Sequence, residues 1–211
     1  MQDLKQLYEA VLNGDAKKAR SVTEEAIAAG VDPMKLVTEY MSPAMHEVGQ
    51  RFECNTFFVP ELLLSARAMK TSLELIRPLL AEKQTQPVGR VVIGTVKGDL
   101  HDIGKNLVAA MLEGGGFEVI DLGVNVPPEK FIAAVQEKNA NVVAMSALLT
   151  TTMPSMKTTI DAFKQAGLRG KVKMLIGGAP ITQKYADEIG ADGYSESAPG
   201  AVALAKRALA A

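Results

Sequence analysis

The residues best suited to chemistry lie in one short segment, 94–104, which holds Asp99 and His101 between Gly98 and Gly104. Imidazole is a good ligand for cobalt and similar metals, and a carboxylate two residues away could accept the second ring N–H and fix the tautomer. One protein ligand suffices when the metal sits in a macrocycle that supplies the equatorial ligands. A hydrogen-bonded structural histidine explains the same residues, so the motif alone leaves both interpretations open.

Other uses of this segment fit less well. A phosphate-binding P-loop has four residues between its glycines and a Ser or Thr after the lysine, whereas five residues separate Gly98 from Gly104 and Asn106 follows the lysine. Zinc needs three or four ligands, but the chain has two histidines and one cysteine, far apart in sequence. A hydrolase would have to use a threonine such as Thr152, which is an uncommon nucleophile inside a chain.

The second part of the chain alternates short apolar runs with helical segments. The runs lie at 91–93, 119–120, 142–145, 172–176 and 191–194, and the helical segments at 105–113, 128–138, 155–166, 182–189 and 198–210. This alternation is typical of βαβ units, a parallel sheet and helices on both faces. We predict an α/β domain of the flavodoxin-like or Rossmann-like class, with five strands in the order 2-1-3-4-5.

This topology brings two polar segments together. Ligands of doubly wound sheets bind beyond the carboxyl ends of the strands, where the winding reverses. Here that place lies between the loop at 94–104 and the loop at 146–152. A phosphorylated receiver domain shares the fold class, but it would carry an aspartate where Ser146 stands.

The first part of the chain contains helical patterns only. They cover 4–12, 16–29, 33–53 with a possible bend at Pro43, and 60–82, and a polar linker follows at 84–87. Four helices with short connections predict a bundle. We therefore expect a helical cap domain over 1–87, the linker included, and an α/β domain over 88–211.

Composition narrows the class of protein further. The 211 residues are 47% hydrophobic and 22% charged, which is typical of a globular chain. Lys and Arg number 23 against 24 Asp and Glu, so charge gives no reason to expect nucleic acid or a membrane as partner. The single cysteine, Cys54, excludes an internal disulfide. No secretory signal or apolar run of about 20 residues is found, and we expect a cytoplasmic location.

Several segments resemble one family. Residues 98–106 resemble the Asp-x-His-x-x-Gly signature of cobalamin-binding domains, in the long form of methionine synthase and of corrinoid proteins of methanogens and acetogens. Further segments match the same family in order, at 121–127, 146–153 and 176–179. In the helical part, 45–52 and 58–66 resemble the cap bundle of these proteins. The resemblance thus covers nearly the whole chain.

The resemblance implies a cobalamin or related corrinoid, bound base-off and His-on. His101 would replace the cofactor's own benzimidazole as the lower axial ligand of cobalt, Asp99 would orient it, and Thr152 would take the place of a serine in the methionine synthase hydrogen-bond relay. These three are the predicted catalytic residues. The predicted cofactor contacts are Gly98, Asp99, Leu100, His101, Asp102, Ile103 and Gly104 in the first loop, Ser146, Leu148, Thr150, Gly177 and Gly178 around the tail, and Phe52, Phe58 and Val59 in the cap.

The outer contacts each have a structural alternative. The glycines at 177–178 leave room for the cofactor tail, but they also suit a tight turn between strand and helix. Ser146 and Thr150 could cap the following helix instead of binding the tail. Phe52 and Phe58 could belong to the core of the bundle.

The resemblance also implies a function. A cap and a corrinoid domain without further modules suit a methyl carrier, which cycles between cob(I)alamin and methylcobalamin in one-carbon metabolism. Its expected partners are a substrate-specific methyltransferase, a second methyltransferase that uses tetrahydrofolate or coenzyme M, and a reductive activation protein. A cobalamin-dependent sensor or regulator and the corrinoid subunit of an adenosylcobalamin mutase are the alternatives. The methyl donor, and whether the chain counts as an enzyme alone, stay open.

Overall fold

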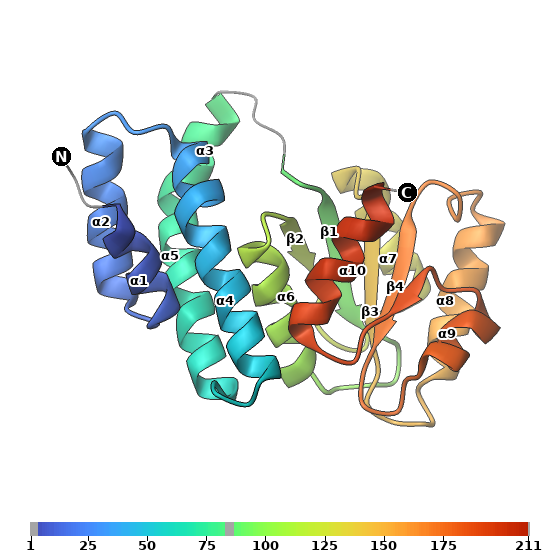
Figure 1. The fold of residues 1–211 in the computed structure, drawn as a ribbon. Coiled ribbons are helices and arrows are strands. Elements are labelled where there is room, and N and C mark those ends of the chain that lie inside the picture. Colours follow the sequence, from blue (N-terminus) through green and yellow to red (C-terminus); the bar gives the residue numbers. More distant parts are fainter. Residues whose placement is uncertain (1–3, 83–86, 211) are drawn as a thin grey trace. The chain divides into compact units, whose positions relative to one another are not determined.

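A computed structural model describes residues 4–82 and 87–210. The chain divides into two compact units. One consists of Met1–Pro87 together with Glu113–Gly116, and the other of Val88–Leu112 and Phe117–Ala211. Figure 1 labels the elements along the chain. The predicted linker at 84–87 lies outside the described residues, except for Pro87.

The first unit is helical, as the sequence predicts. Its elements are α1 (Lys5–Leu12), α2 (Ala16–Ala28), α3 (Pro33–Lys35), the π-helical turn η1 (Leu36–Met41), α4 (Ser42–Glu53) and α5 (Val59–Glu82). The Asp15 carboxylate accepts a hydrogen bond from the Lys18 N–H and so caps the start of α2. Apolar positions at helical spacing, such as Leu7, Met45 and Leu62, are buried and form the core.

The third predicted helix is not a continuous α-helix. The segment 33–53 forms α3, η1 and α4 in succession. At the end of η1 the Ser42 N–H bonds to the carbonyl of Val37, five residues back. This wider turn comes directly before Pro43, whose nitrogen carries no hydrogen to donate. The irregularity therefore precedes the proline, whereas the sequence pattern suggested a bend at it.

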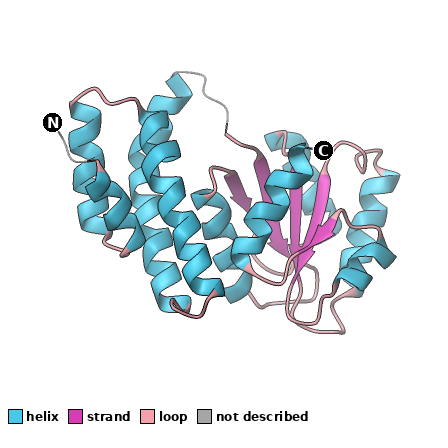
Figure 2. Ribbon diagram, in the orientation of Figure 1, coloured by secondary structure: helices cyan, strands magenta, loops and turns pink. Residues whose placement is uncertain are grey.

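The second unit is a parallel five-stranded sheet with the predicted order β2-β1-β3-β4-β5. Figure 2 shows the strands in magenta. Their bounds are β1 (Arg90–Thr95), β2 (Glu118–Asp121), β3 (Val142–Ser146), β4 (Lys173–Gly177) and β5 (Gly193–Tyr194). The central strands are nearly continuous apolar runs because both of their faces are covered.

Helices cover both faces of this sheet. They are α6 (Ile103–Gly114), α7 (Pro128–Lys138), α8 (Pro154–Gln165), α9 (Gln183–Ile189) and α10 (Ala198–Ala210). One core cluster joins the sheet to Phe131 of α7, Phe163 of α8 and Ile189 of α9. A second cluster joins it to Leu112 of α6 and Ala205 of α10. The prediction of an α/β layer architecture is confirmed.

None of the helices in the described part of the chain combines the length and the hydrophobicity that crossing a membrane requires.

Candidate functional site

The carboxyl ends of three neighbouring strands lie in a row. In the sheet register Thr95, the last residue of β1, pairs with Ser146 of β3, which pairs with Gly177 of β4. The loops that follow these strands therefore start side by side at one edge of the sheet. This edge holds the loop with Asp99 and His101, as expected for a ligand site of this topology.

The Asp99 carboxylate is the centre of a dense hydrogen-bond network. Its side chain is fully buried, and Oδ2 accepts from the backbone N–H groups of Leu148 at 2.8 Å and Leu149 at 3.3 Å. Thr152 Oγ1 lies 2.7 Å from the same oxygen. The other oxygen, Oδ1, lies 3.1 Å from the backbone nitrogen of His101 and 3.1 Å from its ring Nδ1. One carboxylate thus joins the loop after β1 to the loop after β3.

This environment keeps Asp99 ionised. Burial by itself disfavours the charge and raises the pKa of Asp99, but hydrogen bonds from Leu148, Thr152 and His101 stabilise the carboxylate and outweigh burial. The net result is a pKa well below the usual range of an aspartate. An ionised carboxylate can only accept hydrogen bonds, so its partners must all act as donors.

That requirement fixes the tautomer of His101. Because Asp99 can only accept, Nδ1 of the ring carries the proton and Nε2 keeps its lone pair. The His101 side chain is 53% exposed, which leaves the ring accessible from outside. The imidazole therefore has one nitrogen held by the protein and one nitrogen available as a ligand.

The Thr152 hydroxyl has two possible acceptors. Its Oγ1 lies 2.7 Å from Oδ2 of Asp99 and 2.8 Å from the carbonyl oxygen of Leu149. A hydroxyl has a single proton to donate, so it serves one acceptor at a time. The structure brings the three predicted catalytic residues together in the order Thr152, Asp99, His101.

Two residues that support the loop, Thr95 and Asn125, carry no strong signal in the sequence. The Thr95 hydroxyl donates to the His101 carbonyl at 2.8 Å. The Asn125 side chain accepts from the Gly98 N–H at 2.8 Å, and the Asn125 N–H donates to the Asp99 carbonyl at 2.9 Å. Asn125 has a φ of 52°, a left-handed conformation that asparagine tolerates better than most residues. In the sequence, the only hint of this role is that Asn125 stands between two valines.

An ion pair between a buried lysine and an exposed aspartate supports the same region. Lys105, near the start of α6, is buried, and its ammonium lies 2.5 Å from Oδ2 of Asp121 at the end of β2. It also donates to the Asn106 side chain at 2.6 Å. The other Asp121 oxygen accepts from the Gly123 N–H at 2.8 Å. The first turn of α6 is thereby tied to the loop after β2.

The glycines of the site differ in how much space a Cβ atom would have. A Cβ at Gly178, whose φ is 131°, would lie 1.9 Å from the carbonyl oxygen of Ala147, so the chain itself demands glycine there. At Gly177 a Cβ would lie 3.2 Å from the Ser195 carbonyl oxygen. A Cβ at Gly104 would meet nothing within 4 Å. The backbone at Gly104 therefore borders open space.

The surroundings of His101 are apolar and open. Leu100 and Ile103 on either side of it are 71% and 72% exposed, and Leu148 in the facing loop is 41% exposed. Large apolar side chains this exposed, gathered around one polar group, are typical of a ligand surface. Asp102 is exposed and bonds to Asn106 at 3.0 Å.

The tail residues lie at the same edge of the sheet. Ser146 is half-buried and Thr150 is exposed. The residue before α8 is Met153, which makes no side-chain cap, so neither Ser146 nor Thr150 caps that helix. Their predicted role as tail contacts stays a prediction.

The three cap residues lie in the helical unit. Phe52 is a half-buried residue of α4, Phe58 directly precedes α5 and is 61% exposed, and Val59 begins α5. The Phe58 N–H donates to the Glu61 carboxylate at 3.0 Å, which is half of a capping box. The exposure of Phe58 argues against a role in the core of the bundle.

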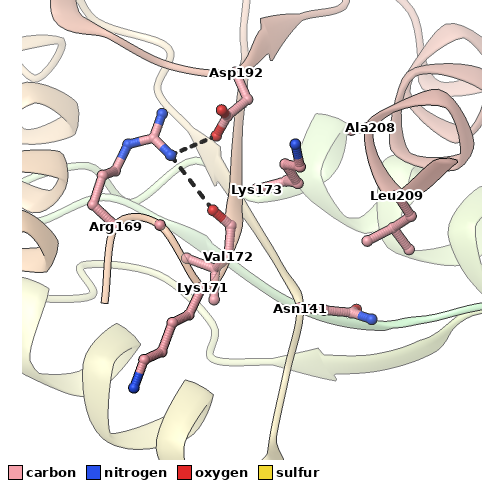
Figure 3. Close-up of a pocket in the computed structure, with 9 residues that line it drawn as sticks. Asn141, Arg169, Lys171, Val172, Lys173, Asp192, Ala208 and Leu209 are labelled. Atoms are coloured by element: carbon pink, nitrogen blue, oxygen red, sulfur yellow. Dashed lines mark hydrogen bonds and ion pairs between the residues drawn. The ribbon is translucent and has the colours of Figure 1, made fainter. Parts of the chain in front are cut away.

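A separate hollow of about 220 Å³ lies away from this edge. Figure 3 shows its residues, which include Asn141 and Lys173 at the amino ends of β3 and β4. Arg169 projects toward Asp192 and pairs with it at 2.8 Å. The hollow is therefore at the opposite ends of the strands from His101, and its arginine is already neutralised.

Among the described residues no group of three or more His, Cys, Asp and Glu side chains could hold a metal ion. A metal bound here would have to bring most of its ligands with it, as the cobalt of a corrinoid does.

Comparison with known proteins decides the family. The B12 binding domain family matches residues 89–203, and a second B12 binding domain family matches residues 3–77. The chain belongs to the B12-binding proteins.

Relatives and solved structures agree with this assignment. The chain is 45% identical over 203 residues to trimethylamine corrinoid protein 1 of Methanosarcina mazei, covering 95% of this chain and 94% of that protein. It is 41% identical over 208 residues to the dimethylamine corrinoid protein of Methanosarcina barkeri, covering 98% and 97%. A crystal structure of the methanol:cobalamin methyltransferase complex of Methanosarcina barkeri matches with a TM-score of 0.87 and 31% identity, covering 99% and 80%.

These findings confirm the predicted corrinoid cofactor and the predicted class of methyl-carrying corrinoid proteins. The B12-binding chain also has residues that fit the cofactor. It offers an accessible Nε2 on His101, an apolar surface around it, and open space at Gly104.

Proposed function

We propose that this corrinoid protein ligates cobalt through Nε2 of His101 and carries methyl groups that come from a methylated amine. The relatives that match over at least 90% of both chains include corrinoid proteins named for trimethylamine, at 42–47% identity, and for dimethylamine, at 41%. Both names specify methylated amines, and this shared chemistry supports the choice of donor.

The geometry of His101 carries the proposal for the ligand. The ring is held at Nδ1 by a buried, ionised carboxylate, and its other nitrogen is accessible. A hydrogen bond to an anion at Nδ1 raises the basicity of Nε2 and keeps the ring in one tautomer. Asp99 therefore prepares His101 as a ligand, and the Thr152 hydroxyl extends the network by one hydrogen bond.

The remaining residues have simpler tasks in this proposal. Leu100, Ile103 and Leu148 present an apolar surface beside the ligand and exclude water from it. Ser146, Thr150 and the glycines at 177–178 contact the cofactor tail. Phe52, Phe58 and Val59 of the cap contact the upper face. When bound, the corrinoid supplies the cobalt that accepts and releases the methyl group.

Partners follow from the carrier role. The solved relative is part of a methanol:cobalamin methyltransferase complex, which supports a complex of this chain with a substrate-specific methyltransferase. A second methyltransferase, using coenzyme M or tetrahydrofolate, and a reductive activation protein complete the proposed cycle, in a cytoplasmic location.

The ligand is tested by the visible spectrum after reconstitution with hydroxocobalamin and gel filtration. Wild type should show a base-off, His-on spectrum. His46→Ala, which removes the second histidine of the chain, located on α4, should show the same spectrum. His101→Ala should lose that spectrum. A His-on spectrum in His101→Ala would refute the proposed ligand.

The donor is tested by pairing the loaded protein with methyltransferases specific for trimethylamine, dimethylamine, monomethylamine and methanol. Methylation of the bound corrinoid should be fastest with one of the amine enzymes. Preference for the methanol enzyme would refute the amine donor and leave the ligand proposal untouched.

A further inference from the structure

Thr95 makes a contact that the predicted site does not include. It is the last residue of β1 and is fully buried. Its hydroxyl donates to the carbonyl oxygen of His101 at 2.8 Å. Its backbone groups have other partners, since its N–H donates to Gly123 and its carbonyl accepts from Val126. The side chain alone is thus directed at the His101 backbone.

The sheet does not need this hydroxyl. Thr95 follows the apolar run from Val91 to Gly94 in a buried strand. Valine has nearly the same shape as threonine and suits a buried strand as well or better. Burying a hydroxyl is unfavourable unless it is hydrogen-bonded. The bond to His101 is therefore what the hydroxyl provides.

His101 is consequently held on both of its peptide groups. Asp99 Oδ1 accepts from the backbone N–H of His101, and Thr95 donates to its carbonyl. Asp99 also holds the ring at Nδ1. The backbone on both sides of a side chain sets the direction of its Cβ, so these contacts together fix where Nε2 points. A ligand already held in its bound geometry loses less freedom on binding.

We propose that Thr95 is a positioning residue for the cobalt ligand: it anchors the His101 carbonyl to the end of β1 and so strengthens ligation by Nε2. The inference rests on the proposed role of His101. Without the hydroxyl the loop keeps its contacts through Asp99, but the carboxyl side of His101 is no longer tied to the sheet.

The test compares Thr95→Val with a matched control, Thr159→Val. Thr159 is also buried in the α/β unit, and its hydroxyl also donates to a backbone carbonyl, that of Ser155, at 2.8 Å. Each substitution removes one hydrogen bond from a hydroxyl to a backbone carbonyl at a buried position. Thr95→Ser restores a hydroxyl at the first position and should recover the wild-type behaviour.

The measured quantity is the midpoint potential of the Co(II)/Co(I) couple in the corrinoid-loaded protein. Co(I) prefers fewer axial ligands, so the potential reports how strongly His101 ligates Co(II). Loss of one hydrogen bond is expected to weaken ligation about three- to tenfold, and a tenfold loss raises the potential by about 59 mV for one electron. Electron paramagnetic resonance of the Co(II) form should show less coupling to the His101 nitrogen.

A second readout needs no cofactor. In the apoprotein, the amide hydrogens of residues 100–102 should exchange faster in Thr95→Val than in wild type or Thr159→Val, while the melting temperatures of the two variants stay similar. If Thr95→Val does not fold, Thr95→Ala removes the hydroxyl without adding bulk and takes its place.

The outcomes separate the two proposals. A potential shift in Thr95→Val no larger than in Thr159→Val, or no recovery in Thr95→Ser, would overturn the role of Thr95. His101→Ala is measured in the same series. If His101→Ala leaves the wild-type potential unchanged, the proposed ligand is wrong. Faster amide exchange in Thr95→Val would then show only that the bond from Thr95 to His101 stabilises the loop.

Discussion

Replacing Asp99 by asparagine should disrupt the hydrogen bonds that hold His101, although the two side chains have nearly the same shape. The carboxylate accepts five hydrogen bonds, three at Oδ2 and two at Oδ1. The amide of asparagine has one oxygen and an NH₂ group that can only donate. In either orientation of the amide, the NH₂ group would face N–H or O–H groups that donate to the carboxylate in the wild type.

Both orientations are unfavourable, for different reasons. If the amide nitrogen replaces Oδ2, it faces the N–H groups of Leu148 and Leu149, which lose their acceptor. If it replaces Oδ1, it faces the backbone N–H and the ring of His101. The ring can then accept at Nδ1 only by moving its proton to Nε2, which removes the lone pair needed for ligation.

The expected cost follows from these lost contacts. Hydrogen bonds to charged groups contribute about 1.5–3 kcal/mol each, and a buried donor without a partner costs about 1–3 kcal/mol. We expect Asp99→Asn to destabilise the α/β unit by roughly 3 kcal/mol at neutral pH. Urea unfolding of the apoprotein measures this loss. Asp102→Asn is the control, because Asp102 is exposed and sits next to the start of α6, where asparagine caps as well as aspartate.

The effect should depend on pH in a defined direction. The pKa of Asp99 is lowered in the folded protein, so the carboxylate stabilises the fold above its unfolded pKa of about 3.9 and loses that contribution as the pH falls toward the folded value. The difference between wild type and Asp99→Asn should therefore be full near pH 7 and shrink below about pH 4. Equal stability of Asp99→Asn and Asp102→Asn at neutral pH would refute the reasoning.

Three further predictions concern glycine and asparagine positions in the α/β unit. Gly104→Ala should stabilise the apoprotein by about 0.5–1 kcal/mol, because alanine favours a helix and meets nothing there, yet it should weaken retention of corrinoid on gel filtration. Gly178→Ala should unfold the protein or lower its stability by more than about 3 kcal/mol, because the added Cβ would collide with backbone. Equal melting temperatures of Gly178→Ala and wild type would contradict this. Asn125→Gly should speed amide exchange at Gly98, whose N–H loses its acceptor, whereas Asn139→Gly, at a matched left-handed position after α7, should leave that amide unchanged.

The order of helices and strands follows from local patterns. Apolar runs alternate with helical segments along the second part of the chain, and five such units fit the flavodoxin-like order that the sheet has. The bounds of α7 and α10 agree with the predicted ranges, 128–138 and 198–210. These signals depend on near neighbours in sequence, so they can be read without the fold.

The third helix marks where local patterns fail. A proline at position 43 predicts a disturbance but not its form. The chain forms a π-helical turn at Leu36–Met41, whose residues Leu36, Val37 and Met41 are all buried. Packing of these side chains and the missing N–H of Pro43 act together, and only the first of these depends on the rest of the fold.

The pairing of Asp99 with His101 can be recognised in the sequence, because a separation of two residues puts a carboxylate within reach of the ring. What holds that carboxylate in place depends on the fold. Two of its donors are backbone N–H groups of Leu148 and Leu149, which have no side-chain signature and come about 50 residues later in the chain. A main-chain donor can be placed only when β1 and β3 lie side by side, and for this reason the surroundings of His101 become visible only in the folded sheet.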